Sequence, residues 1–434
     1  MNFQQSSILS ILGSFGLIFV NMFINVIQSR ILGPEEIGRF QVFITTQTFF
    51  ATICALGIGQ ACIYFINALK EDESKVLATA VNATLPVATL CSVVLFFIII
   101  FYPGYFGKES YMSVALFCIG TDAMLISNIF TPVLLTKMEV VRNQIVKWST
   151  QVFTLVALLL LLLFHMELTV GFLVGLTGIT SMAGCLILYS YFYKRFSFSD
   201  GIDFELLWRL IKWGLKLAGN NVASLTLTSI PVYFLTWFCV SDGFLNVGYY
   251  SRANSLLVIG TVLASSIGPL LYSKWSTVKG EELKAQVRKV SMLFILINMV
   301  IALGLIVFAP LLVHILYGEE FKSAIPILQI LALSLVANGA KEVCYGILSS
   351  QGAPLMIMKN LSICIFLSSL INYFTIPVYG VLGCAITTVL IVFISVFLLI
   401  KDVNKVSIIR FRDFFILPRK ADLMNILYSL KNKN

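Results

Sequence analysis

The sequence predicts an all-α polytopic membrane protein with twelve transmembrane helices in two pseudo-symmetric six-helix lobes. Its 434 residues are 59% hydrophobic and only 12% charged, and the mean hydropathy is +0.94. A bilayer-spanning helix needs roughly 20 apolar residues, and such stretches recur from Ile8 to Ile400. The apolar runs are unbroken, as from Leu155 to Phe164, whereas strands of a membrane barrel would alternate apolar and polar residues.

A glycine-bearing segment occurs twice and indicates that the lobes arose by duplication. The first copy is Arg30-Ile-Leu-Gly-Pro-Glu-Glu-Ile-Gly-Arg-Phe40, and a looser copy, Val240 to Arg252, follows about 210 residues later. The copies align at Ile37-Gly38 and Val247-Gly248. We expect Gly33 to end one helix and Pro34 to open the next, because the first turn of a helix does not need the N–H that proline lacks. Membrane transporters are commonly built from such repeats.

Hydropathy places the twelve spans in chain order. The first-lobe spans are expected near residues 8–28, 40–68, 78–102, 111–135, 148–165 and 169–193. The second-lobe spans are expected near residues 210–238, 249–273, 291–317, 323–350, 361–378 and 380–401. We therefore expect an N-terminal lobe at 1–195, a cytoplasmic linker at 196–209, a C-terminal lobe at 210–401 and a basic cytoplasmic tail at 402–434.

The basic residues are distributed unevenly between the two sides of the predicted membrane. With the N-terminus inside, 24 of the 30 Lys and Arg residues face the cytoplasm and four lie in outer loops. This bias predicts that both termini are cytoplasmic. The formal charge of +9 therefore reflects topology and contact with inner-leaflet lipids, and no nucleic acid partner is expected. The outer loops are short, which leaves no room for a folded external catalytic domain.

Polar side chains line one face of several predicted spans. Span one carries Ser7, Ser14, Asn21 and Gln28 at steps of seven, with Asn25 beside them, so they share one helical face. Three other spans carry polar positions as well. They are Gln41, Thr45, Thr48 and Thr52 on span two, Asn221, Ser224 and Thr228 on span seven, and Arg252, Ser255 and Ser266 on span eight. Hydroxyls and amides can simply join helices in a bilayer. The number on span one nevertheless favours a wet cavity lined by spans one, two, seven and eight.

Charged side chains at membrane depth are costly and therefore indicate function. Arg30 and Arg39 close the outer ends of spans one and two, and Arg252 lies about one turn inside span eight. Snorkelling to headgroups is the alternative role for these arginines. Lys341 lies inside span ten beside Glu342, and Asp122 lies near the middle of span four as a proton site, a cation site or a partner of Lys341. The expected substrate-binding residues are Arg30, Arg39, Arg252, Lys341, Asn21, Asn25 and Gln28, and the expected coupling residues are Asp122 and Glu342.

A cavity whose fixed charges are mainly Arg and Lys favours an anionic cargo. A guanidinium group binds phosphate oxygens two at a time and stays ionised. The diphosphate of a lipid-linked sugar fits this chemistry, because its tail can stay in lipid while the headgroup crosses. An inside-negative potential of ~100 mV favours outward movement by about 2.3 kcal/mol per negative charge. The sequence has no G-x-x-x-x-G-K-[ST] loop, so the phosphate-binding loop of ATPases is not predicted.

Four sequence segments resemble one transporter family. They are Arg30 to Gly38, Leu56-Gly57-Ile58-Gly59, Gly248-Tyr249-Tyr250-Ser251 and Leu316-Tyr-Gly-Glu-Glu-Phe321. In this order and spacing the chain resembles the polysaccharide (O-antigen unit) flippases of the multidrug/oligosaccharidyl-lipid/polysaccharide exporter superfamily. The resemblance covers essentially the whole chain. It implies two six-helix bundles related by a pseudo-twofold axis along the membrane normal.

The same resemblance implies a cargo and a location. The cargo is undecaprenyl-diphosphate-linked oligosaccharide, such as an O-antigen or similar surface polysaccharide unit, flipped between leaflets of the bacterial cytoplasmic (inner) membrane. We expect no cofactor and no bound metal. The expected partners are membrane lipids, a coupling proton or sodium ion, and proteins of polysaccharide assembly.

Two other functions stay open at this point. A multidrug cation antiporter of the same superfamily would need acids in the cavity, where only Asp122 and Glu342 are available. A membrane polysaccharide polymerase or ligase would need a sizeable outer loop or an active-site histidine. His165 and His314 lie near span ends in different lobes, so we expect a protein that is not an enzyme.

Overall fold

The protein is helical throughout the part of the chain that the computed structural model describes, which is residues 3–136, 139–193, 201–239, 242–275, 278 and 280–415. Its helices are α1 (Phe3–Cys54), α2 (Ile58–Asn67), α3 (Glu73–Phe101), α4 (Pro103–Phe106), α5 (Tyr111–Thr136), α6 (Val140–Leu163), α7 (Val170–Phe192), α8 (Phe204–Phe238), α9 (Gly243–Trp275), α10 (Gly280–Tyr317), the 3-10 turn η2 (Glu319–Phe321), α11 (Ala324–Ser350), α12 (Pro354–Val406) and α13 (Phe411–Phe415). Residues 196–200 of the predicted linker and 416–434 of the predicted tail lie outside the described residues.

Each of the twelve predicted spans coincides with helical segments to within a few residues at its ends, and span two is divided between α1 and α2. Within the described residues, eight helical stretches are long and apolar enough to cross a membrane. The merged helices α1 and α12 each hold two predicted spans. Helix α8 is a single helix of 35 residues that includes the whole of predicted span seven. The prediction of a multi-pass, all-α membrane protein is confirmed.

Glycines with positive φ divide the two merged helices at the predicted junctions. Gly33 interrupts α1 with φ 72° and ψ 176°, and Pro34 begins the second half, which confirms the predicted Gly-Pro junction. Span two therefore starts earlier than predicted. It also has a second break, since Leu56 and Gly57 have φ values of 47° and 68° and separate α1 from α2. Gly380, with φ 57°, divides α12 between predicted spans eleven and twelve.

The chain forms two compact units. The first unit consists of Met1–Arg252 and His314–Lys322, and the second consists of Ala253–Val313 and Ser323–Asn434. The predicted lobe limits at residues 195 and 210 stay a prediction.

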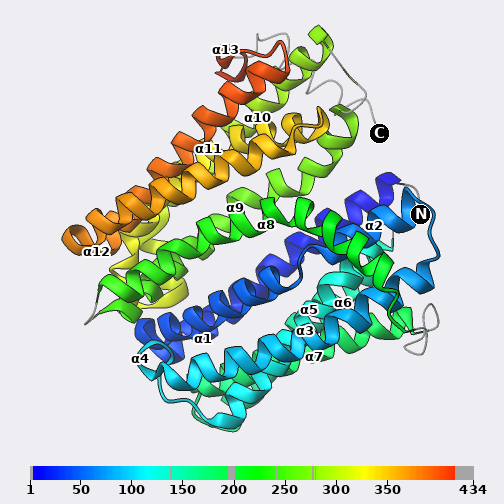
Figure 1. The fold of residues 1–434 in the computed structure, drawn as a ribbon. Coiled ribbons are helices and arrows are strands. Elements are labelled where there is room, and N and C mark those ends of the chain that lie inside the picture. The colour runs from blue at the N-terminus through cyan, green and yellow to red at the C-terminus, as the bar shows by residue number, and fades with distance from the viewer. Residues whose placement is uncertain are drawn as a thin grey trace. The chain divides into compact units, whose positions relative to one another are not determined.

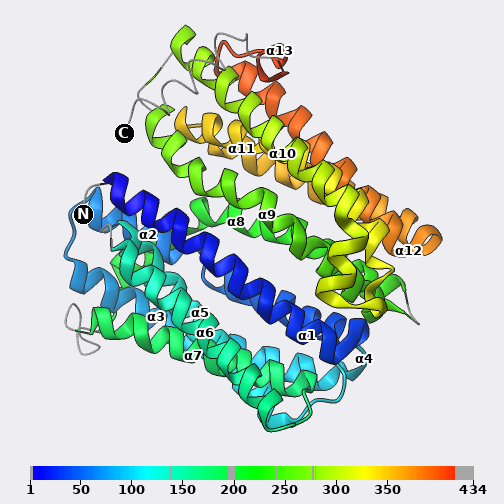
Figure 2. The same ribbon diagram turned by 180° about the vertical axis from the view of Figure 1, so that it is seen from behind.

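The first unit has a large apolar core. In both ribbon views α3, α5, α6 and α7 lie alongside α1 (Figures 1 and 2). Phe65, Leu77, Phe130 and Phe192 are fully buried in one cluster contributed by α2, α3, α5 and α7, and the rings of Phe130 and Phe192 stack at 4.8 Å. Burying such side chains stabilises a fold by about 1.5–3 kcal/mol each in water. In lipid, close packing of this kind is a main source of helix association.

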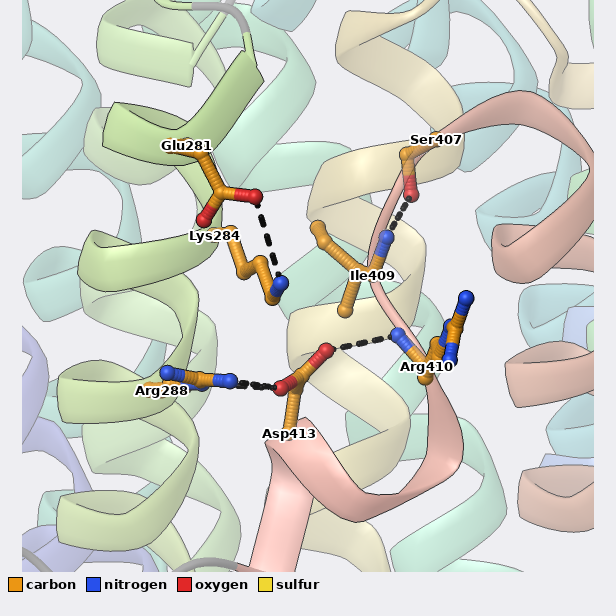
Figure 3. A network of polar contacts seen from close by, with 7 residues as sticks. All are labelled: Glu281, Lys284, Arg288, Ser407, Ile409, Arg410 and Asp413. Atoms are coloured by element: carbon orange, nitrogen blue, oxygen red, sulfur yellow. Dashed lines mark hydrogen bonds and ion pairs between the residues drawn. The ribbon is translucent and has the colours of Figure 1, made fainter.

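The second unit uses polar contacts to join its helices. The Asn360 amide donates to the Ser395 carbonyl oxygen at 3.1 Å, and the Ser395 hydroxyl donates to the Asn360 amide oxygen at 2.7 Å. These bonds tie the two halves of α12 together. Asp413, at the start of α13, accepts the Arg288 Nε–H at 2.8 Å and the Arg410 N–H at 2.8 Å (Figure 3). Burial raises the pKa of Asp413, but these donors outweigh it and hold the pKa below the ordinary value.

Candidate functional site

The two copies of the repeated segment touch each other in the first unit. A Cβ atom on Gly38 would overlap the carbonyl oxygen of Phe244, and a Cβ atom on Gly248 would overlap the carbonyl oxygen of Pro34. Gly38 matches Gly248 and Pro34 matches Phe244 at the same 210-residue offset. The contact is therefore reciprocal, as a twofold relation requires. Only glycine permits backbones to approach this closely, and small residues commonly mark such helix crossings in membranes. We name Pro34, Gly38, Phe244 and Gly248 the glycine crossing.

Arg252 lies one turn beyond the glycine crossing on α9 and is only 5% exposed. Its Nη1 donates to the Asn25 side-chain oxygen at 2.7 Å, and its Nη2 donates to the Gln28 side-chain oxygen at 3.3 Å. The structure thus brings together three of the predicted substrate-binding residues, from α1 and α9. The two amides are neutral, so they orient the guanidinium without cancelling its charge. We name Arg252, Asn25 and Gln28 the arginine centre.

Arg30 and Arg39 are engaged in contacts near the predicted outer ends of their spans. The Arg30 guanidinium donates to the carbonyl oxygens of Ile315 and Leu316 at 2.5 and 3.3 Å. It therefore caps the C-terminus of α10, where cations suit the helix dipole. Arg39 pairs with Glu35 at 2.9 Å and with Glu36 at 3.2 Å, and its guanidinium lies 5.4 Å from the centre of the Phe244 ring. Each arginine thus has a structural partner, and a role in binding substrate stays a prediction.

Asn21 and Asp122 lie apart from the bonds of the arginine centre. The Asn21 amide donates to the Leu17 carbonyl oxygen of its own helix at 3.0 Å. Asp122 on α5 accepts the Ser92 hydroxyl of α3 at 3.1 Å. The other carboxylate oxygen of Asp122 is buried without a hydrogen-bond partner within the described part of the chain. Asp122 therefore keeps one oxygen available for a proton.

Lys341 and Glu342 belong to α11 in the second unit. The Lys341 ammonium lies 6.0 Å from the centre of the Tyr345 ring, which is near the limit for a cation–π contact. Both side chains are half-buried. Their assignment to substrate and ion coupling stays a prediction.

The first unit also contains an open cavity of about 430 Å³ between α1, α2, α5 and α8. Six polar residues line it: Thr52, Gln60, Asn128, Asn221, Ser224 and Thr228. The other lining residues are Ala55, Gly57, Gly59, Pro132, Ala218 and Leu225. Among these lining residues none is charged. A volume of this size falls within the roughly 300–1,000 Å³ of small-molecule sites.

The predicted polar faces contributed only part of this cavity. Thr52, Asn221, Ser224 and Thr228 were expected on the polar faces of spans two and seven, and they do line the cavity. Gln60 and Asn128 were not among the predicted residues, although Asn128 has a polar neighbour at helical spacing, Thr131, that could have indicated it. Of the predicted polar residues of span one, Asn25 and Gln28 belong to the arginine centre instead, and the side chain of Ser7 lies outside the described residues.

The family is decided by a match over most of the chain. The model of a family described as "Polysaccharide biosynthesis protein" matches residues 5–272, which include the glycine crossing, the arginine centre and the cavity. The chain belongs to this family.

Two curated relatives of this polysaccharide biosynthesis family protein are membrane or transport proteins. An uncharacterized membrane protein of Methanocaldococcus jannaschii is 23% identical over 410 residues, covering 87% of this chain and 80% of the relative. The succinoglycan biosynthesis transport protein ExoT of Rhizobium meliloti is 24% identical over 334 residues, covering 76% of this chain. The chain matches 64% of the length of this second relative.

Solved structures show the same fold at low sequence identity. The lipid II flippase MurJ in an inward closed conformation aligns with a TM-score of 0.77 and 14% identity, over 98% of this chain and 93% of that chain. An inward-facing multidrug resistance MATE family transporter of the MOP superfamily aligns with a TM-score of 0.67 and 15% identity, over 96% of each chain. These alignments confirm the predicted fold class, twelve transmembrane helices in two pseudo-symmetric six-helix lobes.

Proposed function

We propose that this polysaccharide biosynthesis protein is a flippase for undecaprenyl-diphosphate-linked oligosaccharide, such as an O-antigen or similar surface glycan unit. The observation that supports this proposal most strongly is the arginine centre. An arginine inside a membrane-spanning helix is costly, and two neutral amide oxygens hold Arg252 in place. A guanidinium presents five N–H donors in a planar fork, which suits diphosphate oxygens.

The proposed cycle is alternating access in the bacterial cytoplasmic (inner) membrane, with both termini in the cytoplasm. The lobes at 1–195 and 210–401 rock against each other, and the polyprenyl tail stays in lipid. The membrane potential favours export of the anionic headgroup by about 2.3 kcal/mol per negative charge at 100 mV. Asp122 and Glu342 are proposed to bind a coupling ion, and proteins of polysaccharide assembly are proposed to receive the cargo.

The proposed anion-binding residues Arg252 and Lys341 can be tested by complementation of a strain that lacks the gene. Arg252→Ala and Lys341→Ala should each reduce surface glycan at least tenfold, about the rate effect of losing 1.4 kcal/mol, while the protein level in the membrane stays unchanged. Arg252→Lys should restore little, because an ammonium cannot reproduce a two-pronged guanidinium contact. Arg209→Ala removes a cation that pairs with Glu71 at 2.7 Å and serves as the matched control. If Arg252→Ala and Lys341→Ala both keep wild-type glycan, the anion-binding proposal is wrong.

A multidrug cation antiporter is the second candidate, and the unsatisfied oxygen of Asp122 favours it. A carboxylate inside a bundle can bind a proton or a cation. This candidate predicts that deletion changes drug susceptibility and leaves surface glycan intact. Loss of drug resistance in Asp122→Asn with normal glycan would replace the flippase proposal.

A further inference from the structure

The open cavity of the first unit has the composition of a site for a neutral, hydrogen-bonding ligand. Three of its lining residues are amides and three carry hydroxyl groups, and none of the residues that line it is charged. The Gln60 side-chain oxygen is buried without a hydrogen-bond partner within the described residues. Leaving a buried acceptor without a hydrogen bond costs about 1–3 kcal/mol. A ligand that donates a hydrogen bond to this oxygen would therefore recover that free energy on binding.

The polar groups come from separate helices and surround the same space. Gln60 is on α2, Asn128 is on α5, and Asn221, Ser224 and Thr228 follow one another at helical spacing on α8. The α8 residues are exposed, so the cavity is accessible. The Thr228 hydroxyl donates to the Leu225 carbonyl oxygen at 3.0 Å, which leaves its lone pairs free to accept. Each amide both donates and accepts.

Sugar rings match this lining better than ions or lipid tails. Every sugar hydroxyl donates and accepts hydrogen bonds, as amides do, and the C–H faces of a ring can contact the apolar part of the wall at Pro132 and Leu225. A charged ligand would lose hydration without meeting an opposite charge. An acyl or polyprenyl chain would leave the amides without partners.

We propose that this cavity binds an uncharged sugar residue of the cargo, at a subsite that is separate from the arginine centre. The inference rests on the proposed function, because it assigns the glycan portion of the cargo to the cavity. None of the residues that line it belongs to the arginine centre. Phosphate and sugar would thus be recognised by different residues of the first unit.

The test uses soluble probes that lack both lipid and diphosphate. Purified full-length protein in lipid nanodiscs is titrated with methyl glucoside, methyl galactoside and methyl N-acetylglucosaminide, and binding is followed by saturation-transfer NMR. Gln60→Leu and Asn221→Leu should each weaken binding of the glycosides about fivefold or more, since each removes a hydrogen-bonding group. Asn82→Leu is the matched amide control, because Asn82 donates to the Gly201 carbonyl oxygen outside the cavity. The glucuronic acid methyl glycoside should bind more weakly than the neutral probes.

The outcomes separate this inference from the proposed function. The sugar subsite is overturned if the wild-type protein does not bind the neutral glycosides. It is also overturned if Gln60→Leu and Asn221→Leu bind them as well as the wild type does. Binding of the glucuronide that equals binding of the neutral probes overturns the neutral class. Arg252→Ala should keep wild-type glycoside binding while it loses surface glycan. If Arg252→Ala keeps surface glycan and the cavity variants lose glycoside binding, the sugar subsite stands and the diphosphate role of Arg252 falls.

Discussion

The glycine crossing and the open cavity are opposite environments in the first unit, and α1 contributes to both. At the crossing, backbone touches backbone, and adding a single methyl group to Gly38 would force α1 and α9 apart. At the cavity, an open space of about 430 Å³ lies between the helices, and a buried amide oxygen has no partner within the described residues. Packing stabilises the crossing, whereas an open space and an unsatisfied polar group at the cavity cost free energy. The comparison shows that the closest packing lies at the glycine crossing. The amide oxygen that lacks a hydrogen-bond partner among the described residues lies at the cavity, where a ligand can bind.

The largest expected effect is at the crossing. Gly38→Ala or Gly248→Ala should destabilise the protein by about 3 kcal/mol or more, the upper end of overpacking effects, because a backbone carbonyl cannot move aside as a side chain can. Gly304→Ala on α10 is the matched control, since no atom lies within 4 Å of its added Cβ. The measurement is the melting temperature of detergent-purified protein. Equal melting temperatures for Gly38→Ala and Gly304→Ala would contradict the tight crossing.

The next effect concerns the arginine centre, one turn from the crossing. A double-mutant cycle with Arg252→Met and Gln28→Leu should give a coupling energy of about 1.5–3 kcal/mol, the range for hydrogen bonds to charged groups. Unfolding free energies in mixed micelles supply the four values of the cycle. A coupling energy near zero would show that the 3.3 Å contact between Arg252 and Gln28 does not fix the guanidinium.

A smaller effect is expected at the cavity wall. Asn221→Leu changes an exposed side chain, so the unfolding free energy should change by no more than about 0.5 kcal/mol. Thermal unfolding of Asn221→Leu, measured together with that of Gly38→Ala, would show the difference between the cavity wall and the crossing. Strong destabilisation by Asn221→Leu would mean that the cavity wall is as tightly packed as the crossing.

The smallest effect should come from Glu109, between α4 and α5. Burial and then the nearby Glu36 raise the pKa of Glu109 above its ordinary 4.5, while Arg39 opposes this shift. The folded state therefore holds the Glu109 proton more tightly than the unfolded state. The contribution of Glu109 to stability is favourable at low pH and falls as pH rises from 4.5 through the folded-state pKa. Glu109→Gln should flatten this part of the melting-temperature profile, and an unchanged slope would exclude Glu109 as its source.

Sequence reasoning was most successful where local chemistry decides structure. The break at Gly33-Pro34 follows from glycine permitting a positive φ and proline opening a helix. The duplication was visible as the shared 210-residue offset, and the glycine contacts agree with it. The α8 face of Asn221, Ser224 and Thr228 followed from helical spacing.

Long-range contacts could not be foreseen from the sequence. Arg30 caps α10 across 286 residues of chain, and no local pattern encodes that pairing. Gln60 on α2 and Asn128 on α5 reach the cavity beside the α8 residues only through tertiary packing. Asn25, Gln28 and Arg252 meet because α1 and α9 pack in one particular register. Hydropathy does not predict that register.

The reciprocal contact of Gly38 and Gly248 also bears on how the gene could diverge after its duplication. Each of these glycines lies against a backbone carbonyl of the other half, so a larger residue at either position would clash. Neither half can therefore change this residue independently. Any acceptable replacement in one half would have to be matched by a displaced backbone in the other. The two halves should therefore have retained an inherited likeness here long after their remaining sequences became dissimilar.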